Sequence, residues 1–194
     1  MIKIMHRVNQ SSDLKNIPSN LGIEVDIRSY GEELIIHHDP FKKGENFNKW
    51  LIEYDHKMLI LNVKEEGLED TLIELMKEKN IKNYFFLDQS FPFLIKHSKS
   101  SGGRSAVRFS EYESINTVLK LKNICNWVWV DCFSNNPLTA NCFKKIKENN
   151  FKICLVSPEL QGKDGPSEIF KLKKDLKDKK ILADAVCTKH PNLW

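Results

Sequence analysis

Residues 22–28 read Gly-Ile-Glu-Val-Asp-Ile-Arg, and residues 58–64 read Met-Leu-Ile-Leu-Asn-Val-Lys. Near-continuous apolar runs of this kind are typical of strands that are buried on both faces of a parallel sheet. Six more runs occur along the chain, with amphipathic stretches rich in Lys and Glu between them. The predicted strands cover residues 2–6, 22–28, 58–64, 84–88, 105–109, 127–133, 152–157 and 185–188.

The stretches between the strands have helical periodicity. The predicted helices cover residues 47–54, 68–79, 91–97, 113–121, 138–149 and 167–177, and residues 8–21 hold at most a short helix. A further apolar run, residues 34–38, follows the second strand across a turn at Gly31 and predicts a hairpin-like extension. The alternation predicts an α/β fold: one domain over residues 1–194 that forms a compact (β/α)8 barrel of the TIM type, with short helices.

Composition restricts the class of function. The chain has 30 basic and 26 acidic residues, a bias too weak to indicate a nucleic-acid partner. No apolar run approaches the roughly 20 residues of a membrane span, and the N-terminus has no signal-peptide pattern. The five cysteines include no Cys-x-x-Cys pair, which favours buried reduced thiols. We therefore expect a cytoplasmic protein with no membrane span, and the sequence does not indicate its oligomeric state.

Polar residues at the ends of the predicted strands are the candidates for chemistry, because barrel active sites lie where strands end. Glu24 and Asp26 alternate with apolar residues, so both carboxylates share one face of a strand. Two carboxylates this close favour a hard divalent cation such as Mg2+ or Ca2+. Alternatively, they form a structural pair that Lys64 or Arg28 neutralises, and the fragment alone leaves both interpretations open.

The next strand repeats this geometry. Asn62 offers an amide oxygen to the same cation, and Lys64 offers an ammonium group to a phosphate oxygen. His6 and His38 are the candidates for proton transfer, because an unperturbed imidazole titrates near pH 6.5. Asp39 or a backbone carbonyl could orient His38, whereas His37 is given no role. Further candidates for substrate binding are Arg108, Asp131 and Lys189, which lie within or at the ends of later strands.

Three motifs follow one another in the first third of the chain: His6-Arg7, Glu24-Val25-Asp26 and His38-Asp39-Pro40. In this order they resemble the glycerophosphodiester phosphodiesterases, a family of the phosphatidylinositol-phospholipase-C-like barrel superfamily. Weaker similarity follows later, in Asn62-Val63-Lys64 and in residues 187–191, Cys-Thr-Lys-His-Pro.

The resemblance implies a role for each matched residue. His6 and His38 would be the general acid and base, with Arg7 and Lys64 holding the phosphate. A divalent metal ion, Mg2+ or Ca2+, would be bound by Glu24, Asp26 and Asn62. The implied activity is that of a phosphoric diester hydrolase of lipid metabolism. Its substrate would be a small glycerophosphodiester-like or sugar-linked phosphodiester, cleaved directly or through a cyclic phosphate.

The sequence departs from the family at three positions. Val8 stands where a glycine usually follows His-Arg, Asn62 replaces a metal carboxylate, and Lys189 replaces the terminal aspartate. Losing a carboxylate weakens cation binding, so the alternative is a barrel that binds phosphoesters without efficient turnover. A third hypothesis is a barrel hydrolase acting on a carbon–nitrogen or carboxyl ester bond, but the first strand lacks the His-x-His pair of a zinc centre.

Overall fold

The computed structural model describes residues 1–194 and has a mixed α/β fold. The chain divides into two compact units: Met1–Met5 together with Ala106–Trp194, and His6–Ser105. All eight predicted strands are present, and most begin and end within one residue of their predicted limits. The largest difference is the strand predicted over residues 127–133, which ends at Val130.

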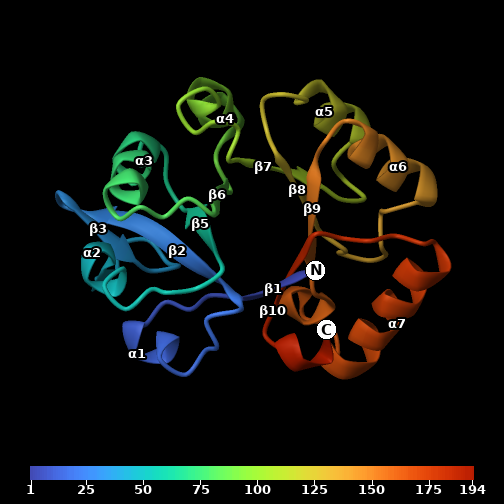
Figure 1. Cartoon of the computed structure of the whole chain (residues 1–194), viewed down its shortest axis with the longest axis horizontal. Helices are drawn as coiled ribbons and strands as arrows, with labels where there is room; N and C mark the ends of the chain where they lie inside the picture. The colour runs from blue at the N-terminus through green and yellow to red at the C-terminus, as the bar shows by residue number, and fades with distance from the viewer. The chain divides into compact units, whose positions relative to one another are not determined.

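The unit His6–Ser105 contains a sheet with the order β4-β3-β2-β5-β6 (Figure 1). Three of its strands run parallel: β2 (Gly22–Tyr30), β5 (Met58–Val63) and β6 (Tyr84–Leu87). β3 (Glu33–Ile36) pairs antiparallel with β2, and β4 (Glu45–Asn46) pairs antiparallel with β3. Parallel pairing at the centre of this sheet brings the carboxyl ends of β2, β5 and β6 to one edge.

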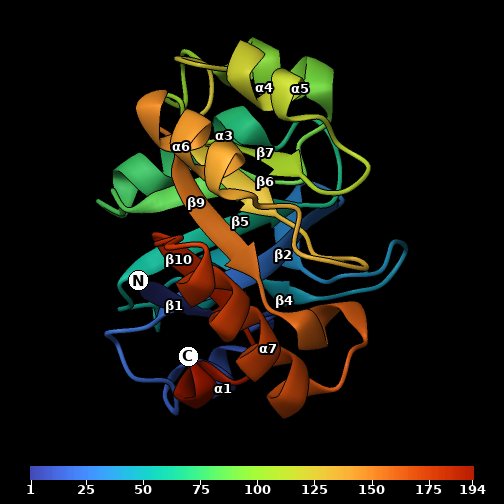
Figure 2. The same ribbon diagram turned by 90° about the vertical axis from the view of Figure 1, so that its right-hand side faces the viewer.

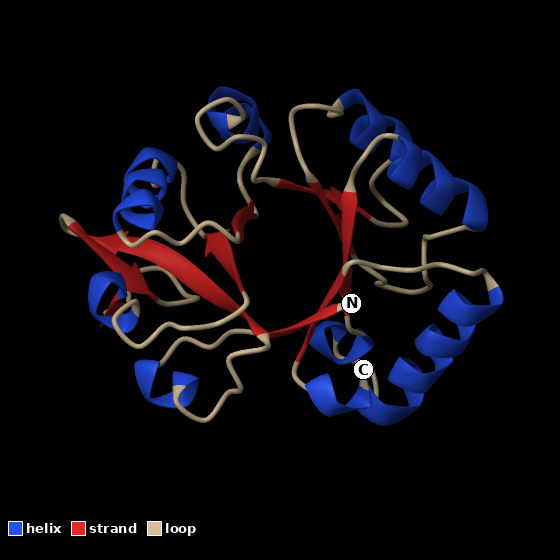
Figure 3. Cartoon of the chain, in the orientation of Figure 1, coloured by secondary structure: helices blue, strands red, loops and turns tan.

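Helices cover this sheet (Figure 3). They are α1 (Ser11–Leu14), α2 (Phe47–Trp50), α3 (Glu69–Glu78) and α4 (Phe91–His97). α2 ends four residues before the predicted limit, because the chain after Trp50 tightens into turns with i→i+3 bonds from the N–H of Ile52 and Glu53. α2 is nevertheless anchored, since Phe47 and Trp50 have no exposed surface.

The other unit is an all-parallel sheet with the order β1-β10-β9-β8-β7. Its strands are β1 (Ile2–Met5), β10 (Ala185–Thr188), β9 (Lys152–Val156), β8 (Trp127–Val130) and β7 (Ala106–Phe109). Nearly every residue in β8, β9 and β10 is buried, as expected for strands that are covered on both faces.

The helices of this unit are α5 (Ile115–Lys120), α6 (Ala140–Glu148) and α7 (Gly165–Asp178). α6 and α7 lie in front of β9 and β10 in Figure 2. Two short 3-10 helices, η1 (Pro158–Gln161) and η2 (Pro191–Leu193), complete the unit.

Two further findings concern the whole chain. No helix combines the length and the apolar character that crossing a membrane requires. The cysteines form no disulfide bond, and all are buried except Cys142, which is partly exposed.

Candidate functional site

The centre of the candidate site is the carboxylate pair on β2. Glu24 and Asp26 are fully buried, and the strand alternation directs them to the face opposite to Ile23 and Val25. The parallel register places Asn62 of β5 beside Asp26. Three polar side chains are therefore held at adjacent positions of two rigid strands.

Glu24 is bound by three neighbours. One carboxylate oxygen accepts a hydrogen bond from the backbone N–H of Arg7 at 2.6 Å and lies 3.9 Å from His6 Nε2. The other accepts from Asn62 Nδ2 at 2.8 Å. Burial raises the pKa of Glu24 from 4.5 to about 7, and the negative charge of Asp26 adds to the effect. The two hydrogen bonds oppose this shift, so the pKa is raised by lost hydration rather than by lost partners.

Asp26 is the anion with the most cationic neighbours. One of its oxygens lies 3.2 Å from Lys64 Nζ. The other lies 3.3 Å from Arg7 Nε and accepts a hydrogen bond from Asn9 Nδ2 at 2.8 Å. Lys64 Nζ is also 3.4 Å from Asp88 at the end of β6. Of the two cations considered as partners of the carboxylate pair, Lys64 lies within ion-pair distance of Asp26, and Arg7 does so as well.

Two residues of this network have a left-handed backbone. Arg7 has a φ of 56° and Asp88 has a φ of 61°. This conformation is uncommon for residues other than glycine, and such residues concentrate at binding and catalytic sites. Asp88 directly follows β6 and Arg7 lies two residues after β1, where the chain leaves the strand in each case.

His38 lies at the end of the β3 segment and is about half exposed. Its Nδ1 is 2.8 Å from Asp39 Oδ1, so Asp39 orients the ring as predicted. The hydrogen bond with His38 lowers the pKa of Asp39 below its usual value. His37 binds the backbone of Asp39 instead, with Asp39 N–H donating to His37 Nδ1 at 2.9 Å.

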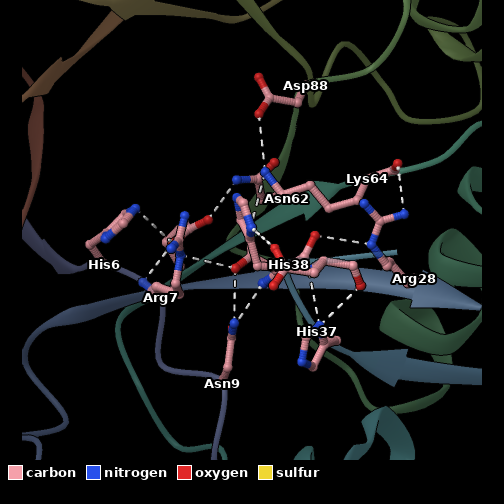
Figure 4. A network of polar contacts seen from close by, with 12 residues as sticks. His6, Arg7, Asn9, Arg28, His37, His38, Asn62, Lys64 and Asp88 are labelled. Carbon is pink, nitrogen blue, oxygen red and sulfur yellow. Dashed lines mark hydrogen bonds and ion pairs between the residues drawn. The ribbon is translucent and has the colours of Figure 1, made fainter. Parts of the chain in front are cut away.

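Figure 4 shows this network as one connected group. Hydrogen bonds and ion pairs connect His6 to Glu24, Glu24 to Asn62 and Arg7, and Arg7 to Lys64 through Asp26. Arg28 joins His38 to the group through the backbone carbonyls of His38 and Lys64. Asn9 was not predicted to take part in the site, whereas Arg28 was considered only as a cation that could neutralise the carboxylate pair, and Asp88 received no specific role. A signal existed only for the last two, because both are polar residues at the end of a strand.

Arg108, Asp131 and Lys189 belong to the other unit. Arg108 forms an ion pair with Asp131, which also accepts a hydrogen bond from Gln161 at 2.9 Å. Burial raises the pKa of Asp131, and the Arg108 guanidinium opposes this rise. Lys189 is exposed, and its N–H donates to Glu159 at 2.9 Å. A role for these residues in substrate binding stays a prediction.

The carboxylate oxygens of Glu24 and Asp26 are ligands of the kind that a hard cation binds. The chain has no group of three or more histidine, cysteine, aspartate or glutamate side chains arranged to hold a metal ion, so an amide would have to be the third ligand. Asn62 Oδ1 is buried and has no hydrogen-bond partner, which is costly for an amide oxygen. A cation bound by Glu24 and Asn62 would satisfy this oxygen and lower the pKa of the carboxyl group.

A separate cavity of about 380 Å3 lies between α7 and the loop after β8. The charged groups of α7 around it pair with one another: Lys171 with Glu168, Lys174 with Asp178, and Lys179 with Asp175. Since these ion pairs leave little uncompensated charge toward the cavity, it is a weaker candidate than the β2–β5 site despite its size.

Comparison with solved structures shows that the chain has the fold of glycerophosphodiester phosphodiesterases. It matches the enzyme of that name from Agrobacterium tumefaciens str. C58 with a TM-score of 0.65 and 10% identity, over 100% of this chain and 99% of that chain. It also matches a glycerophosphoryl diester phosphodiesterase from Parabacteroides distasonis ATCC 8503 with a TM-score of 0.67 and 9% identity, over 99% of this chain and 84% of that chain. No family model and no curated protein matches the sequence.

Proposed function

We propose that the chain is a phosphoric diester hydrolase of the glycerophosphodiester phosphodiesterase type, with its active site on a compact (β/α)8 barrel. The observation that supports this most is the connected network at the ends of β2 and β5. It joins an imidazole, a buried carboxylate pair and two cationic side chains, on a fold shared with solved phosphodiesterases. Fold alone does not imply activity, so the proposal depends on this network.

Each residue of the network has a chemical task in the proposal. Arg7 and Lys64 attract the phosphodiester anion and stabilise the charge that grows on its oxygens during cleavage. His6 and His38 are the general acid and base: one removes the proton from the attacking hydroxyl, and the other protonates the leaving oxygen. Attack by a neighbouring hydroxyl of the substrate would release the alcohol and form a cyclic phosphate, which water then opens.

We propose that Glu24, Asp26 and Asn62 hold one divalent cation, Mg2+ or Ca2+. Such an ion would supply Lewis acidity at the phosphoryl oxygens. The unpartnered Asn62 oxygen and the raised pKa of Glu24 support binding. Asp26 already has Arg7 and Lys64 as neighbours, so its share in cation binding would be the smallest of the three.

A panel of small glycerophosphodiesters and sugar-linked phosphodiesters, assayed with Mg2+, Ca2+ and Mn2+, tests the proposal. Turnover is expected to fall by about 10²- to 10⁴-fold in His6→Ala and in His38→Ala, the usual contribution of a general acid or base. His56→Gln is the matched control, because His56 precedes β5 at the opposite end of the strand and binds the Ile17 carbonyl. Full activity in both alanine variants would show that the assigned acid and base are wrong.

The second candidate function is a barrel that binds phosphoesters without turning them over. The observation that favours it is the amide at position 62, which donates a hydrogen bond to Glu24 where a carboxylate would strengthen a metal site. This candidate predicts binding without turnover with every divalent ion. The variant Asn62→Glu tests this second candidate. If the amide at position 62 is the sole reason that the protein lacks turnover, restoring a carboxylate there should create metal-dependent turnover.

A further inference from the structure

Arg28 lies on the same face of β2 as Glu24 and Asp26, one alternation closer to the end of the strand. Only 15% of its side chain is exposed. A guanidinium group so close to two carboxylates would be expected to pair with one of them. Its hydrogen bonds instead go to backbone carbonyls on either side of β2.

Arg28 Nε donates to the carbonyl of His38 at 3.1 Å, and Nη1 donates to the carbonyl of Lys64 at 3.3 Å. These two carbonyls belong to different segments, one after β3 and one at the end of β5. The regular backbone hydrogen bonds to β2 stop just before these two carbonyls. The last ones run from His37 N–H to the backbone carbonyl of Asp26 and from Lys64 N–H to the backbone carbonyl of Ile27. The guanidinium therefore links the two segments that flank β2, just beyond their last backbone hydrogen bonds to this strand.

We propose that Arg28 is a positioning residue that couples His38 to Lys64, and so sets the distance between proton transfer and phosphate binding. This inference rests on the proposed function. The side chains of His38 and Lys64 project from the residues whose carbonyls Arg28 binds. A shift of either carbonyl therefore moves the imidazole or the ammonium group with respect to the substrate.

Glu65 holds Arg28 in this arrangement. One Glu65 oxygen lies 3.7 Å from Arg28 Nη1, and the other accepts a hydrogen bond from the N–H of Ser29 at 2.6 Å. Arginine suits this position because its planar group offers several N–H donors in a fixed fork, whereas lysine offers one mobile ammonium group. Lysine at position 28 would carry all its N–H donors on one nitrogen atom, so it could not span the two carbonyls with separate nitrogen atoms as Nε and Nη1 of Arg28 do.

The first test compares Arg28→Ala and Arg28→Lys with Arg104→Ala. Arg104 is the matched control, because it also donates to a backbone carbonyl in the same unit, that of Ser101, and has no contact with the site network. We expect kcat to fall by about 10- to 100-fold in Arg28→Ala with KM changed by less than about threefold, the effect of misplaced groups rather than lost binding. Arg28→Lys should lose about as much, although it keeps the charge.

Two further measurements exclude a merely structural role. Guanidinium ion at millimolar concentration should restore part of the activity of Arg28→Ala and none of that of Arg28→Lys, whose side chain still fills the space. In a double-mutant cycle, Arg28→Ala should lower kcat of the His38→Ala protein much less than kcat of the wild type, since coupled residues are not additive. If Arg28→Ala retains kcat within twofold, or if the two losses are additive, the inference is wrong. If Arg28→Ala does not fold, Arg28→Lys decides by the same criteria.

Failure of the proposed function would be visible separately, as a wild-type protein that cleaves no diester. The coupling is then decided by NMR with inorganic phosphate as the probe. In the wild type and in Arg104→Ala, the amide signals of His38 and Lys64 should reach half of their full shift at the same phosphate concentration. In Arg28→Ala the two signals should respond at different concentrations, or only one should respond. Unchanged behaviour in Arg28→Ala, or no response to phosphate in the wild type, would overturn the inference.

Discussion

At the scale of single residues, Glu24 is the side chain whose ionisation depends most strongly on whether the site holds a proton or a cation. Its carboxyl group is fully buried, and its pKa is raised to about 7 by burial and by the charge of Asp26. A proton or a cation can each relieve this cost. The stability of the protein should therefore depend on both pH and divalent ions through this one side chain.

The expected effect follows from proton linkage. Burial raises the pKa of Glu24 to about 7 in the folded protein, whereas in the unfolded chain the carboxyl group keeps its ordinary pKa of 4.5. The folded state thus binds more protons between these values, and stability falls as pH rises through this range by roughly 3 kcal/mol. The free energy of unfolding, measured with urea at pH 5 and pH 7.5 in the presence of a metal chelator, should show this loss in the wild type and not in Glu24→Gln.

Two comparisons complete the measurement. Adding Mg2+ or Ca2+ should reduce the loss in the wild type and should not change the stability of Glu24→Gln, because a bound cation favours the ionised carboxyl group. Glu78→Gln, on the exposed surface of α3, is the control and should behave as wild type. The same pH dependence in Glu24→Gln and wild type would contradict the role given to Glu24.

At the scale of elements, the loop between β3 and β4 determines where His38 lies. Residues 37–43 are largely exposed, yet the loop is closed by Gly44, which packs against the backbone of β3. A Cβ atom at position 44 would lie 2.1 Å from the carbonyl oxygen of Ile36. Only glycine allows this close approach of two backbones.

Gly44→Ala should therefore destabilise the protein by about 2 kcal/mol or more, because the backbone of Ile36 must shift. Since the shift occurs two residues before His38, turnover should fall together with stability. Gly31→Asn is the control: Gly31 has open space around it, and asparagine tolerates its positive φ of 62°. Chemical unfolding and turnover of both variants check this, and equal behaviour of the two would contradict the argument.

Most elements could be predicted from the sequence because burial on two faces gives strands an unbroken apolar pattern. The elements that were not predicted are short: β4 has two residues, η2 has three and η1 has four. Segments of this length are too short to show a periodicity. The site divides in the same way. Glu24 and Asp26 follow from strand alternation, but the bonds of Arg28 end on backbone carbonyls, which leave no signature in the sequence.

At the scale of the whole molecule, the cysteines report on the integrity of the fold. Four are buried in the unit that contains Ala106–Trp194, and burial raises the pKa of Cys125 and of Cys132 to about 12. Thiols with such values carry almost no thiolate at neutral pH. Only Cys142, at the start of α6, has partial access to solvent.

A thiol reagent at pH 7.5 should accordingly modify one cysteine quickly and the other four only as the protein unfolds. Cys142→Ser should remove the fast phase without changing the slow one. Denaturant should make all five equally reactive. Two or more fast equivalents in the native protein would show that this unit is less tightly packed than described.

The left-handed backbone of Arg7 and Asp88 has a consequence for evolution in the laboratory. Each left-handed residue lowers the stability of the folded protein by about 1 kcal/mol, and glycine at the same position would remove this loss. A library selected for heat resistance alone should accumulate glycine at these two positions. Under our proposal it would lose the guanidinium group of Arg7 and the anchor of Lys64, so heat resistance and turnover would be selected in opposite directions at these sites.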